Sequence, residues 1–507
     1  MARPPAARER RAGARTRGAP RPLLVLLLLA CCTPLRPRAA STEIQQPDYS
    51  IYLRRQDLLQ RVADLAAANP RTMRAESRQA SDAGYSIDML IVTAETAGLS
   101  KDSGGHTDKV RLLLDFGEHG REYITSELAL RLLRVLANGT ALEAAAGGAR
   151  RAARLRHILD ACVFKIIPME NTRGRELVER GQLCERKNGR GVDTNRNWDV
   201  DWGKKEKDYD PSEEYPGRAP HSEPEVKIIL SEAQSLQPHV WVNVHSGMYA
   251  LFTPFDHKAT VPDGPDAAAA VRMMERINGL SCKGKCAVGS GGKSVGYLAH
   301  GTATDYMYTK LRVPLSFTWE IYGDMAASFD DCFRMFNPVT KQAFEETLND
   351  WLSAFLHLLE LLPTHPATAP LLRNALAAAD AAEAAAAKGE AAPAAAAPAA
   401  ASLAAGAAGG GGSSGQQQQQ RHSRNAEAHL DAPAGGAQQQ WARFRPHESS
   451  GGGGRSSSGA GPVLLVMAVV ALATAGLLLG RRWGEGRRGD GAGGARPWTP
   501  GLPRAQG

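Results

Sequence analysis

Short apolar segments alternate with helical patterns along much of the chain, and this alternation limits the fold more than any other feature. Continuous apolar runs are typical of strands in a parallel sheet that is covered on both faces. Such runs predict strands at 86–92, 110–116, 162–168, 240–244 and 313–319. Apolar residues at helical spacing predict helices at 52–68, 125–137, 155–159, 222–235, 267–280 and 337–361. We therefore predict an α/β fold with a mixed, mostly parallel central sheet and helices on both faces.

Composition limits the chain to one large globular domain, at residues 47–360. Residues 361–461 consist largely of Ala, Gly, Ser and Gln, so they cannot bury enough apolar surface to offset their conformational entropy. We expect this segment to be a disordered, low-complexity stalk. Within the domain, we expect the Ala/Gly/Arg-rich stretch 139–153 to be a surface insertion, and Asp266 to cap the helix at 267–280.

The formal net charge of +8 arises outside the predicted domain. Residues 1–40 contribute +8 and residues 481–507 contribute +4, so the remainder of the chain carries −4. A domain without a basic surplus is a poor partner for nucleic acid, and we expect no nucleic-acid binding.

Two apolar runs predict the cellular location. Residues 1–40 have an Arg-rich start and an apolar core, which is typical of a secretory signal peptide; the alternative is an organelle transit peptide, which the continuous apolar core argues against. Residues 462–480 are near the lower length limit for a transmembrane helix. The Arg-rich segment 481–507 after them would lie in the cytosol, and it fits poorly with the alternative of a cleaved lipid-anchor signal. We predict a single-pass type I membrane protein of the secretory pathway, with a glycosylation sequon at Asn138.

Five cysteines remain once the leader is excluded. In an oxidising compartment the candidate bridges are Cys282–Cys286 and Cys162–Cys184, which would leave Cys332 unpaired. The alternative is that all five are reduced and packed in the core. Spacing along the chain does not decide the connectivity.

Residues with metal-binding chemistry follow three of the predicted strands: His119 and Glu122, His245, and Glu320. In open α/β sheets ligands bind outside the carboxyl ends of the strands, so we expect these side chains to meet there. His119 and Glu122 alone would equally fit a polar helix start. Together with His245 they form a two-His, one-Glu set, which zinc uses where its fourth position stays open for water.

The chain resembles the zinc metallocarboxypeptidases of the carboxypeptidase A family over about residues 47–360. Five ordered stretches carry the resemblance: His119-Gly-Arg-Glu122, Gly191-Val-Asp-Thr-Asn-Arg-Asn-Trp198, His245-Ser-Gly247, Gly301-Thr-Ala-Thr-Asp305 and Phe317-Thr-Trp-Glu320. The overall pattern is most similar to the plant and algal membrane-anchored branch. The resemblance implies a hydrolase that binds one zinc ion and removes single C-terminal residues from peptides and proteins.

The resemblance also implies roles for individual residues. His119, Glu122 and His245 would bind zinc, and Glu320 would be the general base that deprotonates the zinc-bound water and passes the proton to the leaving amine. Arg186 matches the arginine that stabilises the oxyanion.

Further matches concern the substrate and the support of the metal. Asn195 and Arg196 match the pair that clamps the terminal carboxylate, for which a guanidinium fork is well suited. Arg121 matches a secondary carboxylate contact, and Tyr297 would close over the bound C-terminus. Asp193 matches an acid that orients a zinc histidine.

Two positions bear on which C-terminal residue is removed. Thr304 stands where some members that prefer basic residues carry an acid. Asp256 falls at the spacing where basic-specific regulatory members carry an aspartate. It either lies at the pocket floor, where it would attract a Lys or Arg end group, or it points to solvent in a polar turn.

Two rival functions keep the same scaffold. A zinc amidohydrolase acting on a small amide or a γ-glutamyl bond would have little use for the Asn195–Arg196 pair, which needs a free carboxylate nearby. An inactive, membrane-anchored binding protein would not need the complete set of ligands and base that this chain carries.

Overall fold

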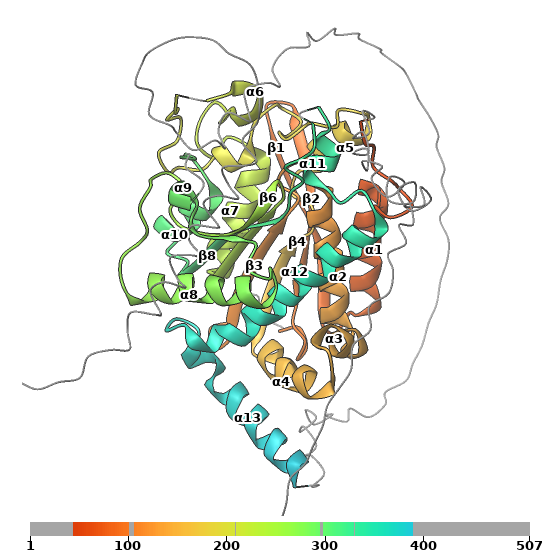
Figure 1. The fold of residues 1–507 in the computed structure, drawn as a ribbon, viewed down its shortest axis with the longest axis vertical. Helices are drawn as coiled ribbons and strands as arrows, with labels where there is room; N and C mark the ends of the chain where they lie inside the picture. Colours follow the sequence, from red (N-terminus) through yellow and green to blue (C-terminus); the bar gives the residue numbers. More distant parts are fainter. Residues whose placement is uncertain (1–43, 101–105, 208, 295–297, 329, 389–507) are drawn as a thin grey trace, which may run out of the picture. The chain divides into compact units, whose positions relative to one another are not determined.

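The computed structural model describes residues 44–100, 106–207, 209–294, 298–328 and 330–388 (Figure 1). The predicted signal peptide, the transmembrane segment, the cytosolic tail and most of the stalk lie outside these residues. Among the helices that are described, none combines the length and the apolar character needed to span a membrane.

An eight-stranded mixed sheet forms the centre of the domain, in the order β1-β2-β4-β3-β5-β8-β6-β7. The strands are β1 (Met73–Asp82), β2 (Tyr85–Ala94), β3 (Val110–Phe116), β4 (Cys162–Ile167), β5 (Val240–His245), β6 (Met248–Thr253), β7 (Ala287–Ser290) and β8 (Leu315–Tyr322). The central strands β4, β3, β5 and β8 run parallel to one another, whereas β1, β2 and β6 join through antiparallel pairings. The predicted α/β fold with a mixed, mostly parallel sheet is confirmed.

Helices cover both faces of the sheet (Figure 1). They are α1 (Arg55–Ala68), α2 (Tyr123–Ala137), α3 (Gly139–Ala146), α4 (Ala149–Asp160), α5 (Thr172–Glu179), α6 (Pro211–Glu214), α7 (Pro224–Leu236), α8 (Pro265–Leu280), α9 (Gly291–Ser294), α10 (Ala303–Thr309), α11 (Cys332–Phe336), α12 (Lys341–Leu361) and α13 (Ala369–Ala387). Side chains alternate between the faces of a strand. In β3, Leu112 and Leu114 pack in the core under α1, α2 and α12, while Leu113 packs in the core under α7 and α10.

Several local expectations were wrong. Stretch 139–153, expected to be a surface insertion, is mostly exposed but forms α3 and the start of α4, and Leu142 anchors it in the core. Asp266 does not cap α8, which begins at Pro265 with Gly264 in the cap position. Strands β1, β6 and β7 were not predicted; in β1 the sequence carries almost no apolar residue after Met73.

A helix also occupies part of the predicted stalk. α12 ends at Leu361, where the stalk was expected to begin, but α13 follows and packs against α4 through the buried Leu372. Ion pairs Arg150–Glu383 and Arg154–Asp380 join the same two helices. Alanine has the highest helix propensity, so an Ala-rich segment with one apolar contact side can be helical where a packing surface is offered.

The disulfide bridges are Cys282–Cys286, as predicted, and Cys184–Cys332. The predicted Cys162–Cys184 pairing is wrong, because Cys162 is buried at the start of β4, beside Val110 at the start of β3. The carbonyl of Cys184 instead accepts a hydrogen bond from Arg121, which follows the opposite end of β3. Two bridges indicate an oxidising compartment such as the secretory pathway.

Candidate active site

A glycine turn places the first site residues at the carboxyl edge of the sheet. Gly117 ends β3 with a φ of +70°, and a Cβ at this position would lie 2.8 Å from Ser126 Oγ. Only glycine fits such a turn without strain. Glu118, His119 and Glu122 follow before α2 begins, and all three are buried.

Two histidines from neighbouring strands meet here. β3 and β5 pair in parallel, with Phe116 beside Val244, so His119 and His245 lie at the same edge. Their Nδ1 atoms are 3.1 Å apart. Glu122 places Oε1 2.7 Å from His119 Nδ1 and Oε2 3.2 Å from His245 Nδ1, while Ser246 N–H donates to Oε2. Two nitrogens and a carboxylate therefore converge on one small volume.

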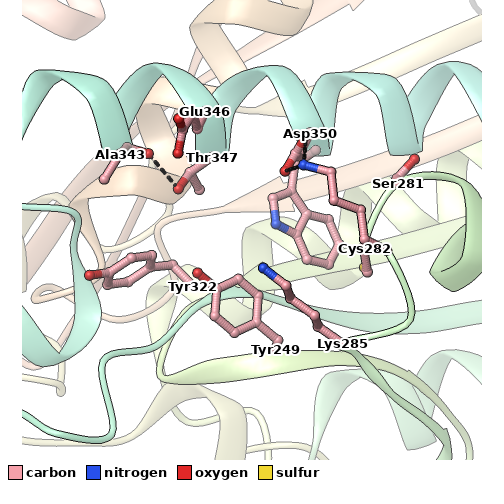
Figure 2. Close-up of a pocket in the computed structure, with 11 residues that line it drawn as sticks. Tyr249, Ser281, Cys282, Lys285, Tyr322, Ala343, Glu346, Thr347 and Asp350 are labelled. Atoms are coloured by element: carbon pink, nitrogen blue, oxygen red, sulfur yellow. Dashed lines mark hydrogen bonds and ion pairs between the residues drawn. The ribbon is translucent and has the colours of Figure 1, made fainter. Parts of the chain in front are cut away.

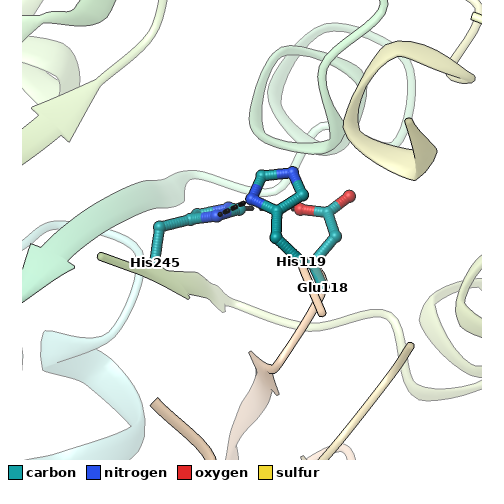
Figure 3. A group of neighbouring side chains, drawn as sticks. All are labelled: Glu118, His119 and His245. Carbon is teal, nitrogen blue, oxygen red and sulfur yellow. Dashed lines mark hydrogen bonds and ion pairs between the residues drawn. The ribbon is translucent and has the colours of Figure 1, made fainter. Parts of the chain in front are cut away.

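A second carboxylate approaches the same histidines. Glu118, His119 and His245 offer ligand atoms that all lie within 4.8 Å of one another, and this group can hold a metal ion (Figure 3). The donor set consists of imidazole nitrogens and carboxylate oxygens in a buried setting, which fits zinc. Glu118 Oε2 is closest to the outer nitrogen of the second histidine, 3.1 Å from His245 Nε2.

Asp193 and Arg186 support the first histidine. Asp193 Oδ1 lies 3.3 Å from His119 Nε2, and Arg186 pairs with Asp193 Oδ2 at 2.8 Å. Burial opposes the ionisation of Asp193, but the positive charges of Arg186 and Arg196 outweigh it and hold the pKa of Asp193 well below its usual range. Asp193 is therefore a carboxylate, and it can accept a hydrogen bond from the N–H at His119 Nε2.

Glu320 lies on β8 beside His245, its partner in the strand register. Its Oε2 atom is buried and has no hydrogen-bond partner among the described residues. Burial raises the pKa of Glu320 to about 8 in the metal-free chain, with His245 opposing and Glu122 adding to the shift. An unpaired carboxyl oxygen beside the two histidines is placed to exchange protons with a ligand there.

One pocket of about 80 Å³ joins these groups. Seven of the predicted site residues line it: His119, Arg186, Asn195, Arg196, His245, Asp256 and Glu320. A different pocket, of about 150 Å³, lies beneath α12 between Tyr249, Tyr322 and Lys285 (Figure 2). No predicted site residue lines that second pocket, so the catalytic chemistry belongs to the first.

Residues 58–352 match the family model described as zinc carboxypeptidase. The chain belongs to this family. It is 26% identical over 335 residues to carboxypeptidase A2 of Rattus norvegicus, an alignment that covers 63% of this chain and 72% of the rat protein. It is 28% identical over 239 residues to carboxypeptidase A2 of Mus musculus, covering 44% of this chain and 53% of the mouse protein.

A solved structure shares the fold of this carboxypeptidase. The crystal structure of carboxypeptidase A from Helicoverpa armigera superposes with a TM-score of 0.50 at 17% identity, over 64% of this chain and 77% of the other. Family and site agree that the protein is a metallocarboxypeptidase, a hydrolase with a zinc cofactor and a His–Glu–His site that removes C-terminal residues.

Asn195 and Arg196 lie in a short 3₁₀ turn (Thr194–Arg196) at the pocket. Asn195 Oδ1 accepts a hydrogen bond from the backbone N–H of Ala303, which leaves its amide nitrogen toward His245 Nε2 at 3.4 Å. Arg196 donates to the Asn195 carbonyl and to Glu214 Oε1, at 2.9 and 3.0 Å. These bonds hold the guanidinium plane at the pocket wall.

Asp256 lies in the pocket and not in a solvated turn. It is 9% exposed, and its Oδ2 accepts a hydrogen bond from Thr302 Oγ1 at 2.8 Å. Its backbone N–H donates to Asp305, which fixes the loop. A Cβ on Gly291 would lie 2.1 Å from Asp256 Oδ1, so glycine leaves room for the carboxyl group. Burial raises the pKa of Asp256 to about 7, with the negative charge of Asp305 adding to the shift.

Two of the predicted residues, Thr304 and Arg121, do not line the pocket. Thr304 is buried and bonds to Thr318 Oγ1 at 2.7 Å, and it is not among the lining residues. Arg121 is also buried, and it pairs with Glu213 at 2.8 Å and lies over the Phe336 ring. Tyr297 lies outside the described residues.

Sequence reasoning missed a buried acid pair beneath the site. The carboxyl groups of Asp115 and Glu170 face each other within hydrogen-bond reach, and the backbone of Phe116 also bonds to Asp115. Burial raises the pKa of Asp115 to about 8, with the negative charge of Glu118 adding to the shift. Asp115 inside the largely apolar run of β3 was the signal in the sequence that could have predicted this pair, since a buried carboxyl group needs a partner.

Proposed function

We propose that His119 Nδ1, His245 Nδ1 and the Glu122 carboxylate hold the zinc. The observation that carries this assignment is the direction of the ring nitrogens. Both Nδ1 atoms face each other and Glu122, whereas the Nε2 atoms face Asp193 and Glu118. Each imidazole thus points its donor atom inward and its N–H outward.

Zinc bound there would lower the pKa of a coordinated water and polarise the scissile carbonyl group. Glu320, with one carboxyl oxygen unpaired, accepts a proton from the attacking water and donates it to the leaving amine. Arg186 lines the pocket with one guanidinium nitrogen 3.2 Å from His119 Nδ1, and it donates to the oxyanion that develops on the substrate.

Asn195 and Arg196 are proposed to bind the terminal carboxylate of the substrate. A planar guanidinium held at the pocket wall matches a carboxylate in bidentate fashion, which restricts the reaction to free C-termini. Arg121 is proposed as a secondary carboxylate contact, which requires that a substrate group replaces Glu213. Tyr297 is proposed to close over the bound residue.

The pocket favours a Lys or Arg end group through Asp256. Among the described residues that line the pocket, the carboxyl groups are those of Asp256 and Glu320. A buried carboxylate attracts a cationic end group strongly because little water screens the pair. Thr304 supplies no acid and bonds away from the pocket, so basic selectivity depends on Asp256.

We also propose that the enzyme is a type I membrane protein of the plant and algal membrane-anchored branch. The apolar run at 462–480, the basic segment after it and the oxidised cysteines support this placement. Its substrates would be peptide or protein C-termini outside the cytosol.

The test uses two peptides of identical sequence, one with a free C-terminal carboxylate and one with a C-terminal amide. We expect the purified protein to contain one zinc ion per chain and to remove the last residue only from the free acid. A zinc chelator should abolish the cleavage, and added zinc should restore it. Equal cleavage of the amidated peptide would refute the carboxylate clamp, and cleavage that survives complete zinc removal would refute the zinc mechanism.

A further inference from the structure

Glu118 is buried directly before the first zinc histidine, yet the proposed catalytic steps give it no role. The tight turn at Gly117 sets its direction. Its backbone carbonyl accepts a hydrogen bond from Asn171 Nδ2 at 3.1 Å. The main chain of Glu118 is therefore held on both sides, and its side chain reaches the end of the neighbouring strand β5.

The Glu118 carboxylate connects two side chains of that strand. Asn243 and His245 are two residues apart on β5, so their side chains lie on the same face of the sheet. Glu118 Oε2 accepts a hydrogen bond from Asn243 Nδ2 at 2.7 Å and lies 3.1 Å from His245 Nε2. Because Asn243 anchors the carboxylate, the imidazole ring has a fixed partner on its outer side.

This contact decides which ring nitrogen of His245 carries the proton. The Glu118 carboxylate, 3.1 Å from Nε2, favours the tautomer with N–H at that position, and the Asn195 amide nitrogen beside the same atom lies farther away, at 3.4 Å. Nδ1 then keeps its lone pair, and it faces His119 Nδ1 at 3.1 Å and Glu122 Oε2 at 3.2 Å. His245 is thus ready to bind a cation without a change of tautomer or of ring orientation.

The two acids behind the histidines differ in their ion-pair partners. Asp193, behind His119, is paired with Arg186 at 2.8 Å, so part of its charge is already neutralised. Glu118 has no described ion-pair partner except His245, and its other side-chain contact is the neutral amide of Asn243. No arginine among the described residues therefore competes with the imidazole for this carboxylate, and a hydrogen bond from Nε2–H to it makes Nδ1 a stronger donor.

We infer that Glu118 is a positioning residue that fixes the tautomer and orientation of His245 and thereby raises the zinc affinity of the site. The inference rests on the proposed assignment of zinc to His119, Glu122 and His245. In this inference Glu118 supports a zinc ligand and does not bind zinc itself, although its carboxylate lies close enough to the two histidines to bind a metal ion with them.

The test is Glu118→Gln in the full chain, which keeps the shape and an acceptor oxygen but removes the charge. Zinc is stripped and returned in competition with a chromophoric chelator. We expect a stoichiometry of one and a zinc dissociation constant raised about 10- to 100-fold. The visible spectrum of the cobalt-substituted protein should also change. Glu127→Gln is the matched control, because Glu127 is buried on α2 and accepts from Leu53 N–H outside the pocket.

The outcomes separate the inference from its premise. Unchanged zinc affinity in Glu118→Gln would overturn the inference, and so would complete loss of zinc, because Glu118 would then be a ligand itself. Absence of zinc from the wild-type protein would instead refute the zinc assignment. If Glu118→Gln does not fold, Glu118→Asp replaces it. The side chain is then shorter by one methylene, which moves the carboxylate away from Nε2 and should also weaken zinc binding. Wild-type zinc affinity in Glu118→Asp would overturn the inference.

Discussion

Replacement of Glu320 by Gln tests the general base directly. Positioned general bases contribute about 10²–10⁴-fold to rate, so we expect kcat to fall by that factor, which corresponds to about 2.7–5.5 kcal/mol of transition-state stabilisation. The change should cost little else, because Glu320 Oε2 has no hydrogen-bond partner among the described residues and an amide has almost the same shape.

The assay compares kcat, zinc content and thermal stability of the wild type and the variant. Zinc should remain at one ion per chain, since Glu320 is not among the groups assigned to the metal, and the melting temperature should stay within about 4 °C. Glu127→Gln again serves as the control for removal of a buried carboxylate. A Glu320→Gln enzyme with intact zinc and kcat within tenfold of the wild type would refute the assignment of Glu320 as the base.

Three further predictions follow from the pocket, the bridges and the surface. Asp256→Ala should lower kcat/KM for Arg-ended peptides far more than for Leu-ended ones. Because the pKa of Asp256 is raised to about 7, the carboxyl group ionises as pH rises from 6 to 8, and the wild-type preference for Arg over Leu should grow over that range. An Arg-to-Leu ratio of kcat/KM that does not change with pH would contradict this. Replacing Cys184 and Cys332 by Ser should destabilise the protein by about 5 kcal/mol in urea unfolding, against about 2 kcal/mol for the Cys282–Cys286 pair, because the chain-entropy term grows with the 148-residue separation; equal losses would show that loop length is not the cause. Asn138 is exposed and should carry a glycan in membrane-associated protein, seen as a gel shift on deglycosylation; its absence would argue against passage through the secretory pathway.

The parts of the fold that could be predicted are those with a single dominant signal. β3, β5 and β8 are buried along nearly their whole length because helices cover both faces, and their largely apolar pattern is readable in one sequence. The site residues at their ends could be predicted for the same reason, since parallel strands deliver their carboxyl ends to one edge. By contrast, β1 is an edge strand with one exposed face and few apolar residues, so its formation depends on pairing with β2.

Contacts between distant side chains were harder to predict. The partner of Cys184 depends on which edge of the sheet each cysteine occupies, and spacing along the chain does not encode that. Asp256 could be placed in the pocket only once its hydrogen bond from Thr302 was known. Glu118 escaped notice because its role depends on which nitrogen of His245 it faces, and a neighbour in sequence gives no such direction.

The Cys184–Cys332 bridge has a consequence for how the enzyme is made in the cell. Cys184 lies two residues before Arg186, and Cys332 begins α11, beyond strand β8, which carries Glu320. The bridge closes a segment of 148 residues that contains β5 and β8, and it fastens the loop before Arg186 to α11 beyond β8. Oxidation of these two cysteines therefore completes the covalent frame around the loop that carries Arg186. Production in a reducing cytosol would leave the Arg186 loop without this covalent link to α11.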